Sequence, residues 1–303
     1  MRVGSLFAGV GGFDLGLERA GMRIVWQVEI DEFARAVLAR HWPDVPKYGD
    51  VRELTGDELD QVDLICGGWP CQPFSYAGKR RGSADERDLW PEFIRIIRRL
   101  RPRWVVGENV PGVLTADSGR YFGRILRDLA ESGYDAAWRV LRAADLGAPH
   151  LRERLFLVAH AGRGGASLAD AQGLRRDRSW ASRYGRGRSA DGGSLAHAGG
   201  EGLPSGPQRR SGAWTPAESV LGRVFDGLPA WLDGHRWPAG RGERQYDWEP
   251  ARTVSRGEVP NRVARLRALG NAVVPQLAEA IGRQIMAFEA TRKASSTWMT
   301  QTR

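Results

Sequence analysis

The sequence predicts an α/β protein whose core is a mostly parallel, doubly wound sheet. Over residues 1–159, short apolar runs typical of strands alternate with longer segments of helical periodicity, and short turns separate them. Such alternation is typical of a parallel sheet covered by helices on both faces. The alternation stops at His160, which predicts a second, less regular region downstream.

The elements of this sheet are predicted in order along the chain. Strands are expected at 3–7, 23–29, 62–66, 103–108, 136–143 and 154–160, and helices at 15–21, 31–42, 89–100, 121–133 and about 275–289. In the helix at 89–100, Phe93, Ile96, Ile97 and Leu100 fall on one face. That face is expected to be buried.

Composition narrows the class of protein. The chain has 303 residues and a formal charge of +9, and its only lysines are Lys47, Lys79 and Lys293. An arginine excess is compatible with a GC-rich genome, or with a polyanionic partner whose phosphates arginine would bind. No apolar run approaches the ~18 residues of a membrane helix, and the N-terminus lacks a signal-peptide pattern, so we expect a cytoplasmic protein without membrane contact.

The two cysteines and five histidines do not predict a metal site. Cys66 and Cys71 are too far apart for a C-x-x-C redox pair, and the histidines are scattered. Cys66 continues an apolar strand and is expected to pack as a small hydrophobic residue.

The region after His160 divides by composition. Residues 161–215 are rich in glycine, arginine and serine, which is typical either of a disordered linker or of a segment that becomes ordered on a nucleic acid. Residues 216–262 carry more apolar anchors and are expected to be folded. Residues 291–303 are expected to form a flexible tail.

The stretch SLFAGVGGFDLG predicts a strand that enters a glycine-rich turn and then a helix. Gly9 and Gly11 would let the main chain approach a nucleotide-type cofactor, although a tight structural turn explains them equally well. Asp14 replaces the third glycine of the dinucleotide pattern, which disfavours a pyrophosphate and a Rossmann dehydrogenase. Glu29 stands where an acid can hold ribose hydroxyls, and Asp50 could read an adenine amine.

The stretch GGWPCQPFSYAGKRRG places Cys71 between two prolines, directly after a predicted strand. Open α/β sheets place their sites at the carboxyl ends of strands, so Cys71 is a candidate nucleophile; a structural cysteine is the alternative. The basic loop that follows would close over a phosphodiester backbone, or would be an ordinary solvated loop.

Two further motifs carry charge near strand ends. Glu108, in ENV, ends an apolar strand, where an acid must be paired or functional unless it caps a helix. Arg152 and Arg154 open the strand at 154–160, and period two would put them on one face. There they would clamp an anion or orient a carboxylate. The alternative is that both are ordinary exposed surface residues.

Taken together, these motifs resemble the DNA (cytosine-5) methyltransferase family of bacterial or phage type. FAGVGG resembles its S-adenosylmethionine loop, GGWPCQPFS its Pro-Cys motif, and ENV its Glu-Asn-Val motif. HLRERLF resembles its Gln-x-Arg-x-Arg motif, with His150 in place of glutamine, and RLRALGNAVVPQLAEAIG its closing Gly-Asn motif.

The resemblance implies a Rossmann-like S-adenosylmethionine-dependent domain over 1–160 and 263–290 and a small, irregular target-recognition domain over 161–262. It implies catalytic roles for Cys71, Glu108, Arg152 and Arg154. The cofactor would contact Phe7, Gly9, Gly11, Glu29, Ile30, Asp50, Val51, Pro70, Asn271 and Val273. DNA would contact Ser75, Lys79, Arg80, Arg81 and Arg87 in the closing loop.

By the same resemblance the chain would act as a monomer on double-stranded DNA. It would be an orphan or prophage enzyme, or would accompany a restriction endonuclease that acts separately. Two alternatives stay open at this stage. One is a tRNA cytosine-5 methyltransferase of the same fold, although the long arginine-rich segment favours DNA. The other is a DNA-binding relative that has lost catalysis, which the presence of Cys71, Glu108 and Arg154 disfavours.

Overall fold

The structure is a computed structural model that describes residues 1–70, 88–162, 244–247 and 260–301, and for 293–301 it describes the main chain alone. All of these residues belong to one compact unit. The predictions for Cys71, Ser75, Lys79, Arg80, Arg81, Arg87 and nearly all of the recognition region fall outside the described residues. The proposed domain division therefore stays a prediction.

The strands are β1 (Arg2–Leu6), β2 (Arg23–Val28), β3 (Lys47–Tyr48), β4 (Leu64–Gly68), β5 (Trp104–Asn109), β6 (Tyr134–Arg142) and β7 (Glu153–Ala161). The α-helices are α1 (Gly12–Arg19), α2 (Glu32–His41), α3 (Trp90–Leu100), α4 (Arg120–Glu131), α8 (Arg262–Asn271) and α9 (Pro275–Gln301). Short 3₁₀ turns include η1 (Val51–Glu53). Every predicted strand and helix is present, with ends shifted by a few residues except at the C-terminal end of α9.

The strands form one seven-stranded sheet in the order β3-β2-β1-β4-β5-β7-β6. The pairs among β1 to β5 are all parallel, and β7 runs antiparallel to both β5 and β6. The mostly parallel, doubly wound sheet predicted from the sequence is therefore confirmed. The strand order reverses between β1 and β4, and sheets of this kind bind ligands beyond the strand ends at such a reversal.

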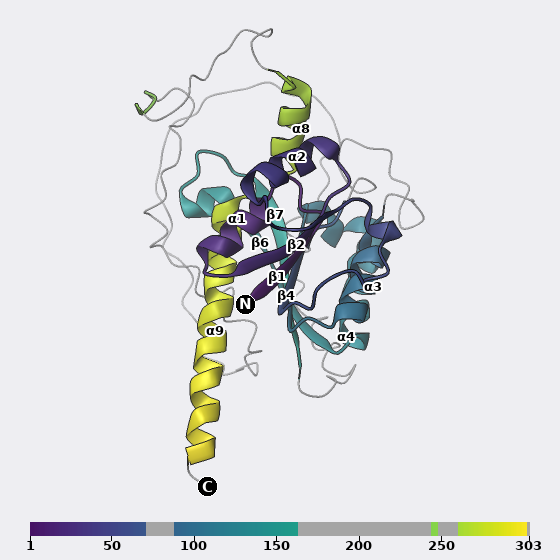
Figure 1. Cartoon of the computed structure of the whole chain (residues 1–303), viewed down its shortest axis with the longest axis vertical. Helices are drawn as coiled ribbons and strands as arrows, with labels where there is room; N and C mark the ends of the chain where they lie inside the picture. The colour runs from purple at the N-terminus through teal and green to yellow at the C-terminus, as the bar shows by residue number, and fades with distance from the viewer. Residues whose placement is uncertain (71–87, 163–243, 248–259, 302–303) are drawn as a thin grey trace, which may run out of the picture. The chain divides into compact units, whose positions relative to one another are not determined.

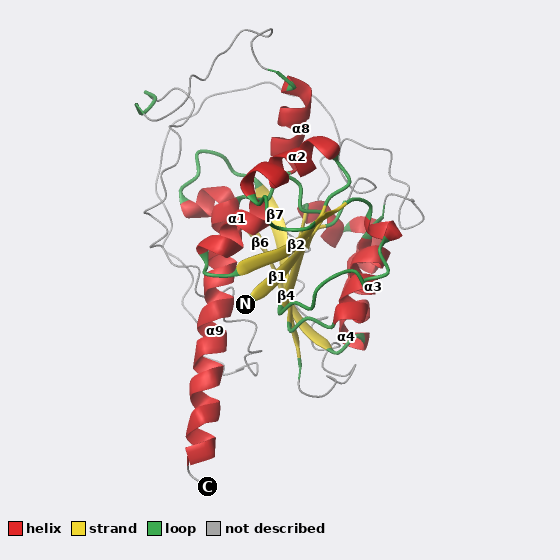
Figure 2. Ribbon diagram, viewed as in Figure 1, coloured by secondary structure: helices red, strands yellow, loops and turns green. Residues whose placement is uncertain are grey.

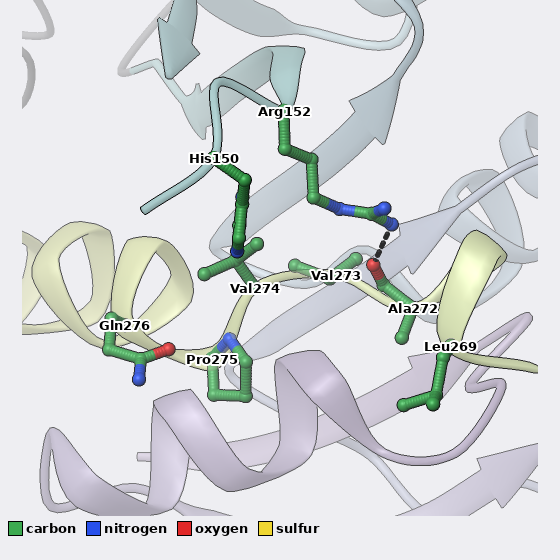
Figure 3. Close-up of a pocket in the computed structure, with 8 residues that line it drawn as sticks. All are labelled: His150, Arg152, Leu269, Ala272, Val273, Val274, Pro275 and Gln276. Carbon is green, nitrogen blue, oxygen red and sulfur yellow. Dashed lines mark hydrogen bonds between the residues drawn. The ribbon is translucent and has the colours of Figure 1, made fainter. Parts of the chain in front are cut away.

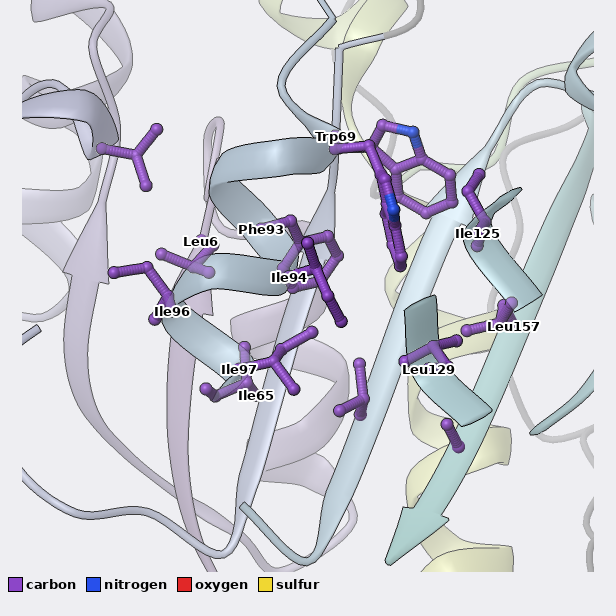
Figure 4. Packing of buried hydrophobic residues seen from close by; sticks show 14 of the residues in the cluster. Leu6, Ile65, Trp69, Phe93, Ile94, Ile96, Ile97, Ile125, Leu129 and Leu157 are labelled. Atoms are coloured by element: carbon purple, nitrogen blue, oxygen red, sulfur yellow. The ribbon is translucent and has the colours of Figure 1, made fainter. Parts of the chain in front are cut away.

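Helices cover both faces of the sheet (Figures 1 and 2). On one face, β-strand side chains pack with α3 and α4, and the predicted apolar face of α3 is buried there (Figure 4). On the other face, Cys66 and Val106 pack with Phe13 of α1 and Ile281 of α9. Cys66 is fully buried, as expected, and burial raises the pKa of its thiol. Neighbouring residues such as Val105 and Val106 serve opposite faces because strand side chains alternate.

The C-terminal helix α9 lies along α1, far from it in sequence (Figure 1). Glycines permit this close packing: a Cβ built on Gly16 would lie 2.3 Å from the Pro275 carbonyl oxygen, and one on Gly282 would lie 2.8 Å from Ala20 Cβ. The C-terminal part of the chain thus packs back against the first helix. The helix runs to Gln301 rather than ending near Glu289, since no proline or glycine interrupts residues 283–301.

Helix α8 was not among the predicted elements. Its apolar residues Val263, Leu266 and Leu269 have the spacing of a helical stripe that could have revealed it. All three are exposed in the structure. Within the described part of the chain, no helix is both long enough and apolar enough to span a membrane.

Candidate active site

The glycine-rich turn after β1 is held in backbone conformations that few residues adopt. Gly9 and Gly11 have φ values of 56° and 84°, and Phe7 also has a positive φ of 52°. A Cβ on Gly11 would lie 2.4 Å from the Trp42 ring, whereas one on Gly9 would meet nothing within 4 Å. Gly9 thus leaves its main chain open to a ligand, and the strained Phe7 is typical of a functional turn.

Glu29, at the end of β2, lies against this turn. Its Oε2 accepts a hydrogen bond from the Gly9 main-chain N–H at 2.7 Å, and its Oε1 accepts one from Asp31 N–H at 2.9 Å. The next residue, Ile30, is 59% exposed. Glu29 thus provides a hydrogen-bond acceptor for ligand hydroxyl groups, and Ile30 provides an apolar surface next to it.

Asp50 and Val51 follow β3, which pairs with β2. The Asp50 carboxylate accepts from Arg52 Nε at 3.0 and 2.9 Å, and this hydrogen bonding is the main reason why the pKa of Asp50 lies below its usual value. It also caps η1, while Val51 is buried beneath. Asp50 therefore lies at the same edge of the sheet as Glu29, and its carboxylate is paired with Arg52.

Asp14, which replaces the third glycine of the dinucleotide pattern, is fully buried under the turn. It accepts hydrogen bonds from Ser5 Oγ at 3.0 Å and from Gln27 Nε2 at 2.7 Å, so it joins α1 to β1 and β2. Burial raises the pKa of Asp14 to about 6, against the opposing effect of the two hydrogen bonds. This structural role was not predicted from the sequence, where the signal for it is an acid flanked by the apolar residues Phe13 and Leu15 at the start of a helix.

Strand β4 leads to the predicted nucleophile and ends beside Glu108. Gly68 pairs with Glu108 across the sheet, and a Cβ on Gly68 would lie 2.9 Å from Glu108 Oε2. The following Trp69 is buried against Trp90 and Phe93. Pro70 is the last described residue before Cys71, so the chain reaches Cys71 from the edge that carries Glu108.

Asn109 holds the main chain on both sides of this edge. Its Nδ2 donates to the Trp69 carbonyl at 3.2 Å, and its Oδ1 accepts from Val110 N–H at 2.8 Å. Asn109 is 3% exposed. This role of Asn109 was not predicted from the sequence, although a polar residue at the end of an apolar strand is a signal for a hydrogen-bonding role.

Glu108 is paired, as the sequence required of an acid at that position. Arg154 Nε lies 2.9 Å from Glu108 Oε1, and the two side chains are 21% and 9% exposed. Burial raises the pKa of Glu108 to about 7, although the positive charges of Arg154 and Arg152 oppose the shift. Near neutral pH this carboxyl is therefore populated both as a hydrogen-bond donor and as an acceptor.

Arg152 differs from the period-two prediction. Strand β7 begins at Glu153, and Arg152 before it has a φ of 36°, so the extended alternation does not include it. Its Nη2 donates to the Gly270 carbonyl at 3.0 Å and also to the Ala272 carbonyl (Figure 3). Arg154 thus pairs with Glu108, while Arg152 binds the segment 270–273, which comprises the end of α8 and the residues that turn the chain toward α9; we call it the 270–273 turn.

A cavity of about 420 Å³ lies beside this turn (Figure 3). Its lining comes from His150 and Arg152 on one side and from residues 269 and 272–276 on the other. Of the two cofactor candidates in the turn, Asn271 is exposed and Val273 is buried. The structure therefore brings the C-terminal motif to the same edge as the strand ends of β1, β4, β5 and β7.

Comparisons with known proteins agree with this geometry. The model of the family described as "C-5 cytosine-specific DNA methylase" matches residues 1–169. The chain is 33% identical to the Type II methyltransferase M.NaeI of Lentzea aerocolonigenes, over 95% of this chain and 75% of that protein. It is 44% identical to the Type II methyltransferase M.NgoMIV of Neisseria gonorrhoeae, over 50% of this chain and 49% of that protein.

Several other Type II methyltransferases are aligned over less than half of their length, including M.BsuFI of Bacillus subtilis at 36% identity, 50% of this chain and 37% of that protein. The chain thus spans about half the length or less of most of the curated relatives that it matches. Among solved structures, it is similar to a DNA modification methyltransferase encoded within an E. coli prophage. That match has 30% identity and a TM-score of 0.47, and it covers 53% of this chain and 47% of the other.

Proposed function

The chain belongs to the C-5 cytosine-specific DNA methylase family, and from this premise we propose that it transfers a methyl group from S-adenosylmethionine to carbon 5 of cytosine in a short duplex DNA sequence. The observation that carries the proposal is the buried Glu108–Arg154 pair, which lies beside the end of β4 that leads into Pro70 and Cys71. The strand that ends beside this carboxyl, whose pKa is raised, is the one that leads into the candidate nucleophile.

The residues at the ends of β1 and β2 fit S-adenosylmethionine. The open main chain at Gly9 allows close approach, the Glu29 carboxylate suits ribose hydroxyls, and exposed Ile30 suits one face of an adenine ring. Phe7, Gly11, Asp50, Val51, Pro70, Asn271 and Val273 complete the proposed set. When bound, S-adenosylmethionine supplies an electrophilic methyl group on its sulfonium.

The protein side of the reaction follows from the weak nucleophilicity of cytosine C5. We assign the Cys71 thiolate to attack C6, which makes C5 enamine-like; after methylation a base removes the C5 proton and the cysteine is eliminated. Protonated Glu108 donates to N3 of the ring and offsets the charge that develops there, while Arg154 fixes the Glu108 carboxyl. Because C6 cannot be reached inside the base stack, the cytosine must flip out of the duplex.

Double-stranded DNA is the proposed partner. Ser75, Lys79, Arg80, Arg81 and Arg87 would contact it in the loop after Cys71, and residues 161–262 would read its sequence. The formal charge of +9 supports a polyanionic partner. The names of the relatives suggest a restriction-modification setting, in which a separate endonuclease cuts unmethylated DNA. We propose a monomer that works in the cytoplasm, where bacterial DNA lies.

Expression in a methylation-free bacterial host, followed by cytosine-methylation sequencing of the genome, tests the proposal. We expect methylated cytosines within one short motif, and none with Cys71→Ser. Cys66→Ala is the matched control: it removes the other thiol, which lies in the sheet core, and should leave the motif methylated while the protein folds.

Folded, abundant protein that leaves all DNA unmethylated would overturn the proposal. In that case, 5-methylcytosine in the tRNA of the same cells would identify the alternative RNA substrate. Its absence there too would favour a relative without catalytic activity.

A further inference from the structure

Arg152 has a role that the motif alone does not assign. The guanidinium binds the Gly270 and Ala272 carbonyls, which flank Asn271 on either side. These residues are more than a hundred positions away in the chain. A single charged group therefore fixes the main chain around one exposed asparagine.

The 270–273 turn, which Arg152 binds, also contacts the glycine-rich turn. A Cβ on Gly12 would lie 2.3 Å from the Val273 carbonyl oxygen, so the start of α1 and the 270–273 turn are in direct contact. Val273 and Val274 are buried at this junction. A shift of the 270–273 turn would therefore be transmitted to the turn that carries Gly9 and Gly11.

Arg152 makes this contact from an unusual backbone conformation. Its φ of 36° is rarely adopted by residues other than glycine, and such conformations persist where surrounding contacts fix them. Ordinary extended backbone at this position would direct its side chain with the alternation of β7, toward the face of Arg154. The positive φ instead accompanies the reach to the 270–273 turn.

We infer that Arg152 is a positioning residue for the cofactor: it fixes the Asn271 turn against the glycine-rich turn, whereas Arg154 serves the target base through Glu108. Two arginines of one motif thus divide between the two substrates. The inference rests on the proposed function, because it assumes that S-adenosylmethionine binds between these turns. It changes the role of Arg152 from the catalytic one that the resemblance implied to a positioning one.

Calorimetric titration of the full chain with S-adenosylmethionine, without DNA, tests the inference. We expect Arg152→Ala to weaken binding about tenfold or more, since the turn loses two charge-assisted hydrogen bonds. Arg152→Lys, which keeps a cationic donor, should recover part of the affinity. The matched control Arg154→Ala should bind S-adenosylmethionine within about twofold of wild type, because its partner is Glu108.

Steady-state kinetics give the second readout. Arg152→Ala should raise KM for S-adenosylmethionine with little change in kcat at saturation, whereas Arg154→Ala should lower kcat. Asn271→Ala combined with Arg152→Ala should weaken binding by less than the product of the single effects, since Arg152 acts through the same turn.

Equal weakening by the two arginine variants would indicate a general structural effect and overturn the inference, as would wild-type affinity in Arg152→Ala. If Arg152→Ala does not fold, the two lysine variants carry the test. Weaker binding of S-adenosylmethionine by Arg152→Lys than by Arg154→Lys counts for the inference, and equal affinity of the two counts against it. Absence of binding by the wild-type chain would instead refute the proposed function.

Discussion

Two buried carboxyl groups at this edge of the sheet are held in different ways. Glu108 faces Arg154, and burial raises its pKa to about 7. Asp14 is held by two neutral groups, and burial raises its pKa to about 6. Glu108 lies beside the end of β4, the strand that leads to the proposed nucleophile, whereas Asp14 lies beneath the glycine-rich turn, so the two pKa shifts should have separate effects.

The pKa of Glu108 predicts a decline in methyl transfer at high pH. Below about 7 the carboxyl is protonated and can donate to cytosine N3; above it the carboxylate can only accept. We therefore expect kcat/KM for DNA to fall above neutral pH. Formation of the Cys71 thiolate acts in the other direction, because it increases the rate as pH rises.

Glu108→Gln isolates this effect. The amide donates at every pH but is a far weaker acid, so kcat should fall by roughly 10²- to 10³-fold and the decline near pH 7 should vanish. The test is to measure the rate at limiting DNA concentration between about pH 5.5 and 9. The same decline in the glutamine variant would show that another group causes it.

Asp14→Asn should stabilise the protein at high pH. Because the folded-state pKa is raised from 3.8 to about 6, the stability that Asp14 contributes is full below about pH 4 and lost as pH rises through 6. Asparagine can accept from Gln27 and donate to Ser5 without a charge, so we expect a gain of about 1–3 kcal/mol at pH 8.

Denaturant unfolding at two pH values checks this prediction. The gain should shrink near pH 5, where wild-type Asp14 is already largely protonated. A variant that is less stable than wild type at both pH values would mean that the charge itself supports the turn.

At the scale of elements, the contact between α1 and α9 depends on the absence of side chains. A Cβ on Gly16 would meet the Pro275 carbonyl, Ala278 and the Glu279 main chain, all within 2.8 Å. Gly16→Ala should therefore destabilise the protein by about 1–3 kcal/mol, because neither helix can move without disturbing the core.

Gly123→Ala is the matched control for this prediction. Gly123 lies in the interior of α4, is exposed, and a Cβ there would meet nothing within 4 Å. The same substitution should stabilise by about 0.5–1 kcal/mol through helix propensity. Thermal unfolding of both variants measures the difference, and equal shifts would argue against tight packing of α1 on α9.

At the scale of the whole molecule, α9 completes a core that the first 160 residues leave open. Leu277, Ile281 and Ile285 are buried against the sheet, and Glu289 accepts from the Trp104 indole at 3.0 Å and pairs with Arg103. The sheet face beneath α9 would be exposed without it.

Two truncations test this dependence. Removal of 275–303 should abolish cooperative unfolding, whereas removal of 293–303 keeps these contacts and should change Tm by no more than about 2–4 °C. Circular dichroism melting measures both. A cooperative transition in the shorter chain would show that residues 1–274 fold without α9.

The sequence by itself predicted six of the seven strands that the structure describes, most of the helices and the mostly parallel sheet, because alternating apolar periodicity is a local signal; the two-residue strand β3 is too short to give that signal. It also put the glycine-rich turn, Cys71 and Glu108 each at the end of a predicted strand, and parallel strands end at one edge of a sheet. The structure places Glu108 and that turn at this edge, while Cys71 lies just beyond the described residues.

The tertiary structure alone decided how the charged residues are paired. Arg152 and Arg154 are two positions apart and identical in type, yet one binds a turn 120 residues away and the other binds Glu108. Asp14, which stands where a dinucleotide pattern would have its third glycine, is a buried link between α1, β1 and β2. Hydrogen-bond partners depend on which distant segments the fold brings within about 3 Å of each other. The periodicity of apolar residues along the chain does not specify those segments.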